Sequence, residues 1–192
     1  MPQQSQLVLK RATEPWEFEQ LHLLNYATFV EEIPQHGPNA ERRLVDSMLD
    51  RSDCFICLDG QKLVGMVTVC GKRPFSLDRK LPDLDSYLPP GRRPCEVRLM
   101  SVEKTHRTGR IFVKLMEQVL LYCDENGYDM LVASTTDRQW SMLRQGGGIE
   151  FGPLLGTPEA RFRGMYLLRE HVPSDLRSAL RARRSDDGVA QL

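Results

Sequence analysis

The stretch of sequence that decides the fold is residues 96–126, EVRLMSVEKTHRTGRIFVKLMEQVLLYCDEN. Residues 96–102 are rich in apolar side chains and predict a strand. Residues 104–110 form a basic turn, in which Gly109 permits unusual backbone angles and Thr105 and Thr108 are possible helix caps. The following residues repeat apolar side chains at the spacing of one helical face. These are Ile111, Phe112, Leu115, Met116, Val119, Leu120 and Cys123.

This strand–turn–helix segment has features of an anion-binding site. The turn delivers free N–H groups to the start of a helix, where the helix dipole favours negative charge. It also contributes the guanidinium groups of Arg107 and Arg110. Backbone donors and cations together suit a phosphate or pyrophosphate, so the segment predicts a nucleotide-like cofactor.

The same segment resembles the pyrophosphate-binding motif of the GNAT superfamily of N-acyltransferases. That motif is a strand, then Arg-Gly-x-Gly-x-Gly/Ala, then a helix, and residues 107–112, RTGRIF, occupy its place. Leu115 and Met116 fall at the usual Leu-Leu position. Arg110 and Phe112 stand where small residues are usual, so the motif is degenerate. The alternative interpretation is a generic strand–turn–helix of an α/β domain, which is a common unit.

The order of the other expected elements extends the resemblance over residues 7–170. The Asp59-Gly60 pair between two apolar runs predicts a hairpin. The expected elements are a strand at 7–11, a helix at 16–30, a hairpin at 54–69, a strand at 128–134, a short helix at 137–144 and a last strand at 165–169. The resemblance implies an α/β GNAT fold, with a mixed, mostly antiparallel central sheet flanked by helices, in a domain of residues 1–170. Residues 171–192 are expected to be a tail, either a short helix or disordered.

Two local strings are similar to a narrower group, the acyl-homoserine-lactone synthases and long-chain N-acyl amino acid synthases. They are residues 25–32, NYATFVEE, and residues 96–99, EVRL. In that group an aromatic residue after the first helix, and a Glu and an Arg on the fourth strand, belong to the acyl-transfer site. The matching positions are Phe29, Glu96 and Arg98. An Arg is usual where this chain has Asn25.

The resemblance also implies roles for particular residues. Glu96 is expected to be the catalytic base or, alternatively, a partner of Arg98. The Tyr that usually reprotonates the leaving thiolate is replaced by Leu143, so water is expected to serve. The backbone after Glu96 is expected to hold the thioester and pantetheine, and the basic turn to hold the pyrophosphate. These cofactor-binding residues are Leu99, Met100, Ser101, Val102, Arg107, Thr108, Gly109, Arg110 and Ile111.

Composition agrees with a compact enzyme domain. The chain has 192 residues, of which 41% are hydrophobic and 27% are charged, and its net charge is +0. This balance gives no broad electrostatic case for nucleic acid or an anionic membrane. Cys54 and Cys57 formally make a C-x-x-C, but they lie within a strand signal and are expected to be reduced strand residues. No metal site, signal sequence or membrane span is expected, and a reducing cytoplasm is the expected compartment.

A Pro-rich connector at residues 72–95 interrupts the regular pattern. It is too long for an ordinary loop inside a compact domain and too apolar for a solvated linker. One interpretation is a lid or wall beside an acyl pocket, and the other is an ordered surface insertion with its own cluster. The apolar residues in question are Phe75, Leu77, Leu81, Leu84, Tyr87 and Leu88.

The sequence therefore favours an N-acyltransferase that moves an acyl group from acyl-CoA or acyl carrier protein to a small-molecule amine. A long-chain acyl group and an amino acid acceptor are one option. Two alternatives remain open: a plain acetyltransferase using acetyl-CoA, and a degenerate domain that binds acyl-CoA without turnover.

Overall fold

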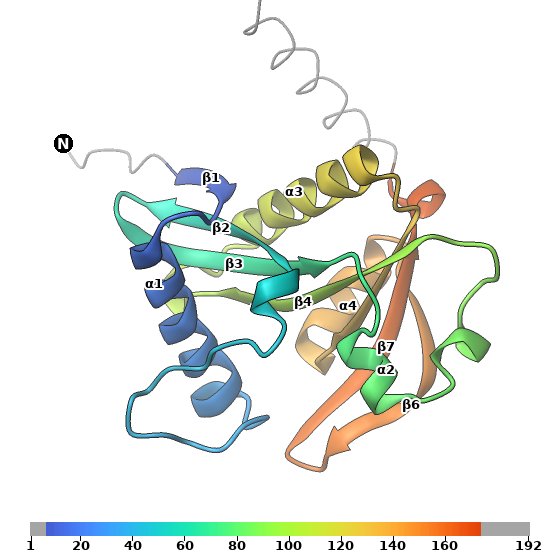
Figure 1. Ribbon diagram of the computed structural model, residues 1–192, viewed down its shortest axis with the longest axis horizontal. Helices are drawn as coiled ribbons and strands as arrows, with labels where there is room; N and C mark the ends of the chain where they lie inside the picture. The colour runs from blue at the N-terminus through green and yellow to red at the C-terminus, as the bar shows by residue number, and fades with distance from the viewer. Residues whose placement is uncertain (1–6, 174–192) are drawn as a thin grey trace, which may run out of the picture.

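The computed structural model describes residues 7–173, which form a mixed α/β fold around a seven-stranded sheet (Figure 1). The strand order is β1-β2-β3-β4-β5-β7-β6. All neighbouring pairs are antiparallel except β4 and β5. The strands are β1 (Leu7–Arg11), β2 (Asp53–Asp59), β3 (Lys62–Cys70), β4 (Pro94–Val102), β5 (Met130–Thr135), β6 (Ile149–Thr157) and β7 (Ala160–Leu168). The α-helices are α1 (Pro15–Tyr26), α2 (Ser76–Lys80), α3 (Arg110–Asn126) and α4 (Asp137–Gln145).

Local interactions and glycine conformations set the start of α1 and both ends of α3. At the start of α1 the Glu17 carboxylate accepts hydrogen bonds from the N–H groups of Thr13 and Glu14, at 2.8 and 3.1 Å. These bonds satisfy donors that the first helical turn leaves unpaired. Helix α3 is bounded by Gly109 and Gly127, which adopt left-handed backbone angles with φ of 79° and 71°. Only glycine takes these angles without a steric cost.

Helices α3 and α1 cover opposite faces of β2 and β3 (Figure 1). Successive side chains of a strand point to opposite faces, so a strand covered on both sides is buried throughout. In β2, Cys57 joins the core under α3 whereas Cys54 joins the core under α1. Both cysteines are free and buried. Their spacing of three therefore places them on opposite faces of the sheet, and they do not form a redox pair.

The Pro-rich connector forms a cluster of its own. Its apolar side chains pack on β5, β6 and β7 through Met130, Val132, Phe151 and Leu168. This is the ordered insertion that was one of the two interpretations of residues 72–95. The other interpretation was a lid or wall beside an acyl pocket. The apolar side chains do not take that role because they pack in the core, whereas Ser76, Arg79 and Lys80 of the same connector line a cavity described below. The buried connector residues are Phe75, Leu77, Leu81, Leu84 and Leu88.

Most predicted elements are confirmed, with three differences. The predicted helix at 16–30 continues past α1 as a π-helical segment, η1 (Ala27–Glu32). The strand β6 was not predicted, because its Gly152, Pro153 and Gly156 are poor strand formers. The last strand, predicted at 165–169, begins five residues earlier, since β7 spans Ala160–Leu168. The predicted tail after residue 173 lies outside the described residues.

The contact between α3 and β3 should limit the size of residue 65. A Cβ atom at Gly65 would lie 2.7 Å from Ile111 Cγ2 and 3.3 Å from Leu115 Cδ1. Overpacking of this kind costs about 1–3 kcal/mol, so Gly65→Ala should lower the free energy of unfolding by that amount. Gly37→Ala is the matched control, since nothing lies within 4 Å of its added Cβ. Urea denaturation measures both, and equal stabilities would contradict the tight α3–β3 contact.

Candidate active site

The site is formed where β4 and β5 part. Their parallel pairing runs from Pro94 opposite Met130 to Val97 opposite Ala133 and then stops. Beyond this point β4 has a bulge, because Leu99 and Met100 together stand opposite the single residue Val67 of β3. Leu99 adopts φ of 48°, a left-handed angle that is uncommon for a residue with a side chain. The bulge turns β4 away from its partner, and bulges of this kind often occur beside active sites.

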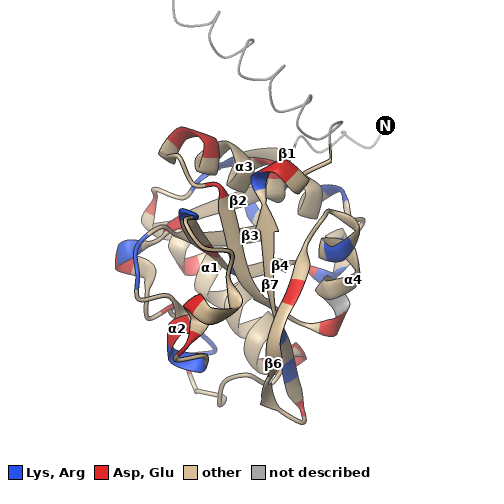
Figure 2. Ribbon diagram, turned by 90° about the vertical axis from the view of Figure 1, so that its right-hand side faces the viewer, with Lys and Arg blue, Asp and Glu red and all other residues tan. Residues whose placement is uncertain are grey.

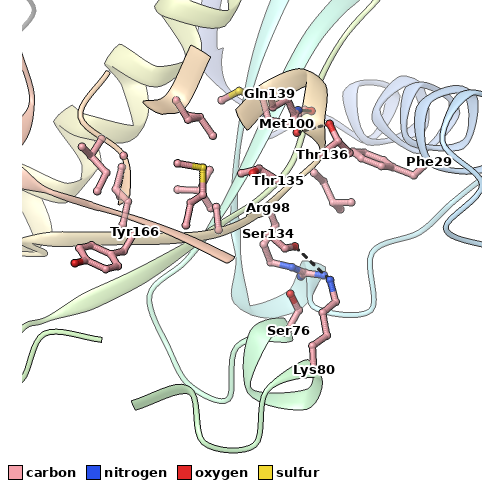
Figure 3. Close-up of a pocket in the computed structure, with 18 of the residues that line it drawn as sticks. Phe29, Ser76, Lys80, Arg98, Met100, Ser134, Thr135, Thr136, Gln139 and Tyr166 are labelled. Carbon is pink, nitrogen blue, oxygen red and sulfur yellow. Dashed lines mark hydrogen bonds between the residues drawn. The ribbon is translucent and has the colours of Figure 1, made fainter. Parts of the chain in front are cut away.

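The parting strands enclose a cavity of about 290 Å³, here called the inter-strand cavity. One side of it is apolar and lies toward α3, with Val97 and Ala133 contributed by β4 and β5. The next residues of the same strands, Arg98 and Ser134, point to the opposite face, as strand alternation requires. The remaining apolar lining is Leu99, Met100, Phe112, Met116, Leu131, Leu143, Met165 and Leu167. The polar lining is Gln35, His36, Ser76, Arg79, Lys80, Thr135, Thr136, Gln139 and Tyr166, with Phe29 at one side (Figure 3).

A second hollow of about 140 Å³ adjoins the inter-strand cavity on the side of the basic turn. The two share Met100, Phe112, Thr136 and Gln139 in their walls. The Gln139 amide donates to the Met100 carbonyl at 3.0 Å and so ties α4 to the bulge. The turn-side hollow is also lined by Ser101, Val102, Arg107 and Gly109. The shared walls place the end of β4 between the turn and the inter-strand cavity.

The residues of the basic turn have different environments. Arg107 donates to both carboxylate oxygens of Glu32, at 2.7 and 2.5 Å, and to the Val102 carbonyl at 2.7 Å. Its charge is therefore neutralised by an acid in this structure. Arg110 is exposed at the first turn of α3, and Thr108 is exposed beside it. Ile111 buries its side chain in the core below α3.

The candidate base, Glu96, is buried and fully engaged. Its carboxylate accepts hydrogen bonds from Ser76 N, Ser76 Oγ and Leu77 N at 2.7, 2.6 and 2.9 Å. The Arg98 guanidinium lies 3.6 Å away. Glu96 has no exposed surface and is absent from the walls of both cavities. Because its hydrogen bonds tie the first turn of α2 to the strand, this geometry favours a role in fixing α2 to β4.

Arg98 joins this buried charge network to the inter-strand cavity. It donates to Asp46 at 2.9 Å, and Asp46 itself is buried. Surface charges elsewhere are also mixed, and Figure 2 shows basic and acidic positions side by side around α2, where Arg73 pairs with Asp78. The positive charge of Arg98 is balanced by two carboxylates, those of Asp46 and Glu96. Arg98 also lines the inter-strand cavity.

Sequence reasoning missed several cavity residues. His36 lines the inter-strand cavity. Burial lowers its pKa, with Lys80 and Arg98 acting in the same direction and Asp46 opposing them. Lys80, Ser134 and Tyr166 also line the cavity and carried no motif. The one available signal for Ser134 was its place at the end of the strand predicted at 128–134, directly after the apolar run at 130–133.

The structure describes residues 7–173. No group of three His, Cys, Asp or Glu side chains is placed to hold a metal ion there. None of the helices in this part of the chain is both long and apolar enough to cross a bilayer.

Comparisons with known proteins agree with this architecture. The acetyltransferase (GNAT) domain family matches residues 24–117. FeeM, an N-acyl amino acid synthase from uncultured soil microbes, superposes with a TM-score of 0.68 at 18% identity, over 86% of this chain and 92% of FeeM. The AHL synthase LasI gives a TM-score of 0.73 at 15% identity, over 86% and 91% of the two chains. The CoA-dependent acyl-homoserine lactone synthase BjaI, solved with SAM and isopentyl-CoA, gives 0.68 at 20% identity, over 86% and 81%. No curated protein matches the sequence.

The environment of Glu96 predicts a structural effect of its replacement. In Glu96→Gln an amide NH₂ replaces one oxygen, so at least one of the three donors from α2 loses its acceptor. Leaving a buried donor unsatisfied costs about 1–3 kcal/mol, and the free energy of unfolding should fall by that amount. Urea denaturation measures the fall, with the exposed Glu159→Gln as control. Unchanged stability together with a lost step in the pH–rate profile would instead establish Glu96 as the base.

The environments of the basic turn predict that Arg107 and Arg110 contribute differently to CoA binding. Arg110 is exposed and at a helix N-terminus, so Arg110→Ala should weaken CoA binding by about tenfold through loss of a charge-assisted hydrogen bond. Arg107→Ala together with Arg110→Ala should weaken it further. Calorimetric titration with CoA measures both, with the exposed Arg161→Ala as control. If the folded double variant bound CoA as tightly as the parent, the basic turn would not be a binding site for CoA.

Proposed function

Because the chain carries a GNAT acyltransferase domain, we propose that it transfers an acyl group longer than acetyl from a pantetheine thioester to the amine of a small molecule. The observation that carries the proposal is the apolar side of the inter-strand cavity, which is lined by residues of β4, β5, β7 and α3. An acetyl group needs no such space. A volume of about 290 Å³ is near the lower end of ordinary ligand pockets, about 300 Å³.

The proposed reaction joins an amine nitrogen to the thioester carbonyl carbon. The C–N bond forms, the C–S bond breaks, and the carrier leaves as a thiolate with the electron pair of that bond and then takes a proton from water. The backbone at the bulge, from Leu99 to Val102, is the proposed binding site for the thioester carbonyl and the pantetheine arm, because it borders both cavities. Aligned backbone donors at such a position stabilise the negative charge that develops on the carbonyl oxygen.

The amine must also lose a proton. Glu96 is the acceptor predicted from the sequence, and the hydrogen bonds from Ser76 and Leu77 weigh against it. His36 is the second candidate, since it lines the cavity and its lowered pKa favours the neutral imidazole that accepts a proton. Phe29, in η1, is proposed to contact the substrates from the cavity wall.

The donor is proposed to be acyl-CoA or an acylated carrier protein. Both present a pantetheine arm with phosphate at its end. The Arg107–Glu32 pair lowers the positive charge of the turn, whereas exposed Arg110 keeps it cationic. A donor panel decides between the two: acetyl-CoA, dodecanoyl-CoA and dodecanoyl carrier protein, each with a mixture of amino acids. Thiol release is measured and products are identified by mass spectrometry.

One observation favours a second function, binding of acyl-CoA without turnover. Leu143 lines the cavity at the position where the resemblance places the acid for the leaving thiolate, and it cannot supply a proton. Tight binding of dodecanoyl-CoA with no acyl product from any amine in the panel would establish this second function. Equal or better use of acetyl-CoA would instead establish a plain acetyltransferase.

The size of the cavity predicts how a larger residue changes donor preference. Ala133→Leu would fill part of the apolar side near the point where β4 and β5 part. Each buried methylene is worth about 0.8 kcal/mol, so loss of room for two should reduce dodecanoyl preference over acetyl more than about tenfold. Competition between the two acyl-CoA donors measures this ratio. Ala40→Leu, at an exposed site outside both cavities, is the control, and an unchanged ratio in Ala133→Leu would place the acyl chain elsewhere.

A further inference from the structure

The polar side of the inter-strand cavity holds a cation without an acidic partner. The Lys80 ammonium donates to Ser134 Oγ at 3.3 Å and lies 4.8 Å from the centre of the Phe162 ring. Figure 3 shows Lys80 extending toward Ser134 and the end of Arg98. Within residues 7–173, no carboxylate lies within ion-pair distance of Lys80.

Three arginines around the site are neutralised by carboxylates. Arg98 pairs with Asp46 and Glu96, and Arg107 pairs with Glu32. Arg163, on the neighbouring β7, pairs with Asp137 and Glu150. Lys80 therefore gives the cavity a local positive charge, to which the exposed Arg79 on the same helix adds. Such a charge is an attractive partner for an anion that enters the cavity.

The surroundings of Lys80 are unfavourable to its charge in the absence of an anion. Burial of the ammonium lowers the pKa of Lys80, Glu96 opposes the shift and Arg98 adds to it. Lys80 as a whole is an exposed residue, and its ammonium contacts Ser134 Oγ and the Phe162 ring. A bound anion would supply the missing counter-charge, and desolvated pairs of this kind gain more than exposed ones.

Helix α2 holds this ammonium in place. The first residue of α2, Ser76, is bound to Glu96 through two hydrogen bonds, and Leu77 is fully buried. Lys80 follows one helical turn later, at the end of α2. Two anchors in the first turn therefore fix the base of the Lys80 side chain beside the cavity.

We propose that Lys80 binds a carboxylate of the acceptor, so that the protein selects amines bearing an acid group over neutral amines. The inference rests on the proposed function, because it assigns the polar side of the cavity to the acceptor and the apolar side to the acyl chain. Lys80 and Ser134 supply donors for the carboxylate oxygens, and the acceptor amine then lies toward the parting of β4 and β5.

A binding experiment tests this assignment without requiring turnover. The probes are N-dodecanoylglycine and its uncharged analogue N-dodecanoylglycinamide, which differ in the acid group alone. Calorimetric titration should show the parent protein binding the acid about tenfold more tightly, as expected for one charge-assisted contact. Lys80→Met should remove this preference and Lys80→Arg should keep it. Lys72→Met, at an exposed site outside both cavities, should match the parent.

The outcomes separate the residue assignment from the reaction. A preference for the acid that survives in folded Lys80→Met, or no preference or no binding in the parent, overturns the role of Lys80. Amine acylation is measured separately with glycine and glycinamide as acceptors. A Lys80-dependent preference in binding with no acylated product from either acceptor would refute the transferase while retaining Lys80 as an anion ligand.

Discussion

The architecture of the site depends on one constraint, the end of the parallel pairing between β4 and β5. Four paired positions hold the two strands together, and the pairing stops at Val97 and Ala133. Had it continued, the sheet would be closed and side chains would fill the space between the strands. Because β4 bulges away at Leu99 and Met100, the gap opens through the sheet and exposes both faces to one cavity. Strand alternation then makes the two sides chemically different.

The second determinant is the buried Glu96 carboxylate. Burying a charge is costly unless it is paired and hydrogen-bonded, and here three donors from α2 together with Arg98 meet that requirement. These hydrogen bonds join segments that are distant in the sequence, because they hold α2 of the Pro-rich connector against β4. The same carboxylate therefore links the order of the connector to the shape of the polar side of the cavity.

The segment at residues 96–126 was predictable because its signals are local: a strand pattern, a Gly-containing turn and an amphipathic helix. The Glu96 interaction was not, since its donors lie about twenty residues earlier in the chain, in a segment without a regular pattern. Lys80 was not predicted for the same reason. The role of the connector was ambiguous because the same apolar residues are expected in a lid and in a core. The strand β6 was not predicted because its Gly and Pro residues have low strand propensity, which tertiary pairing with β7 overrides.

The two sides of the cavity suggest why the reactants would approach from different directions. An acyl chain gains free energy by leaving water for the apolar side, lined by Met116, Leu131 and Met165. A charged acceptor cannot enter that side without losing hydration, whereas the polar side offers Lys80 and Ser134 as replacement donors. The reacting carbonyl and amine would then meet at the parting of the strands, the place where the two environments join. Holding both groups there would convert an encounter of two molecules into a reaction within one complex, a rate advantage that does not depend on an acid at Leu143.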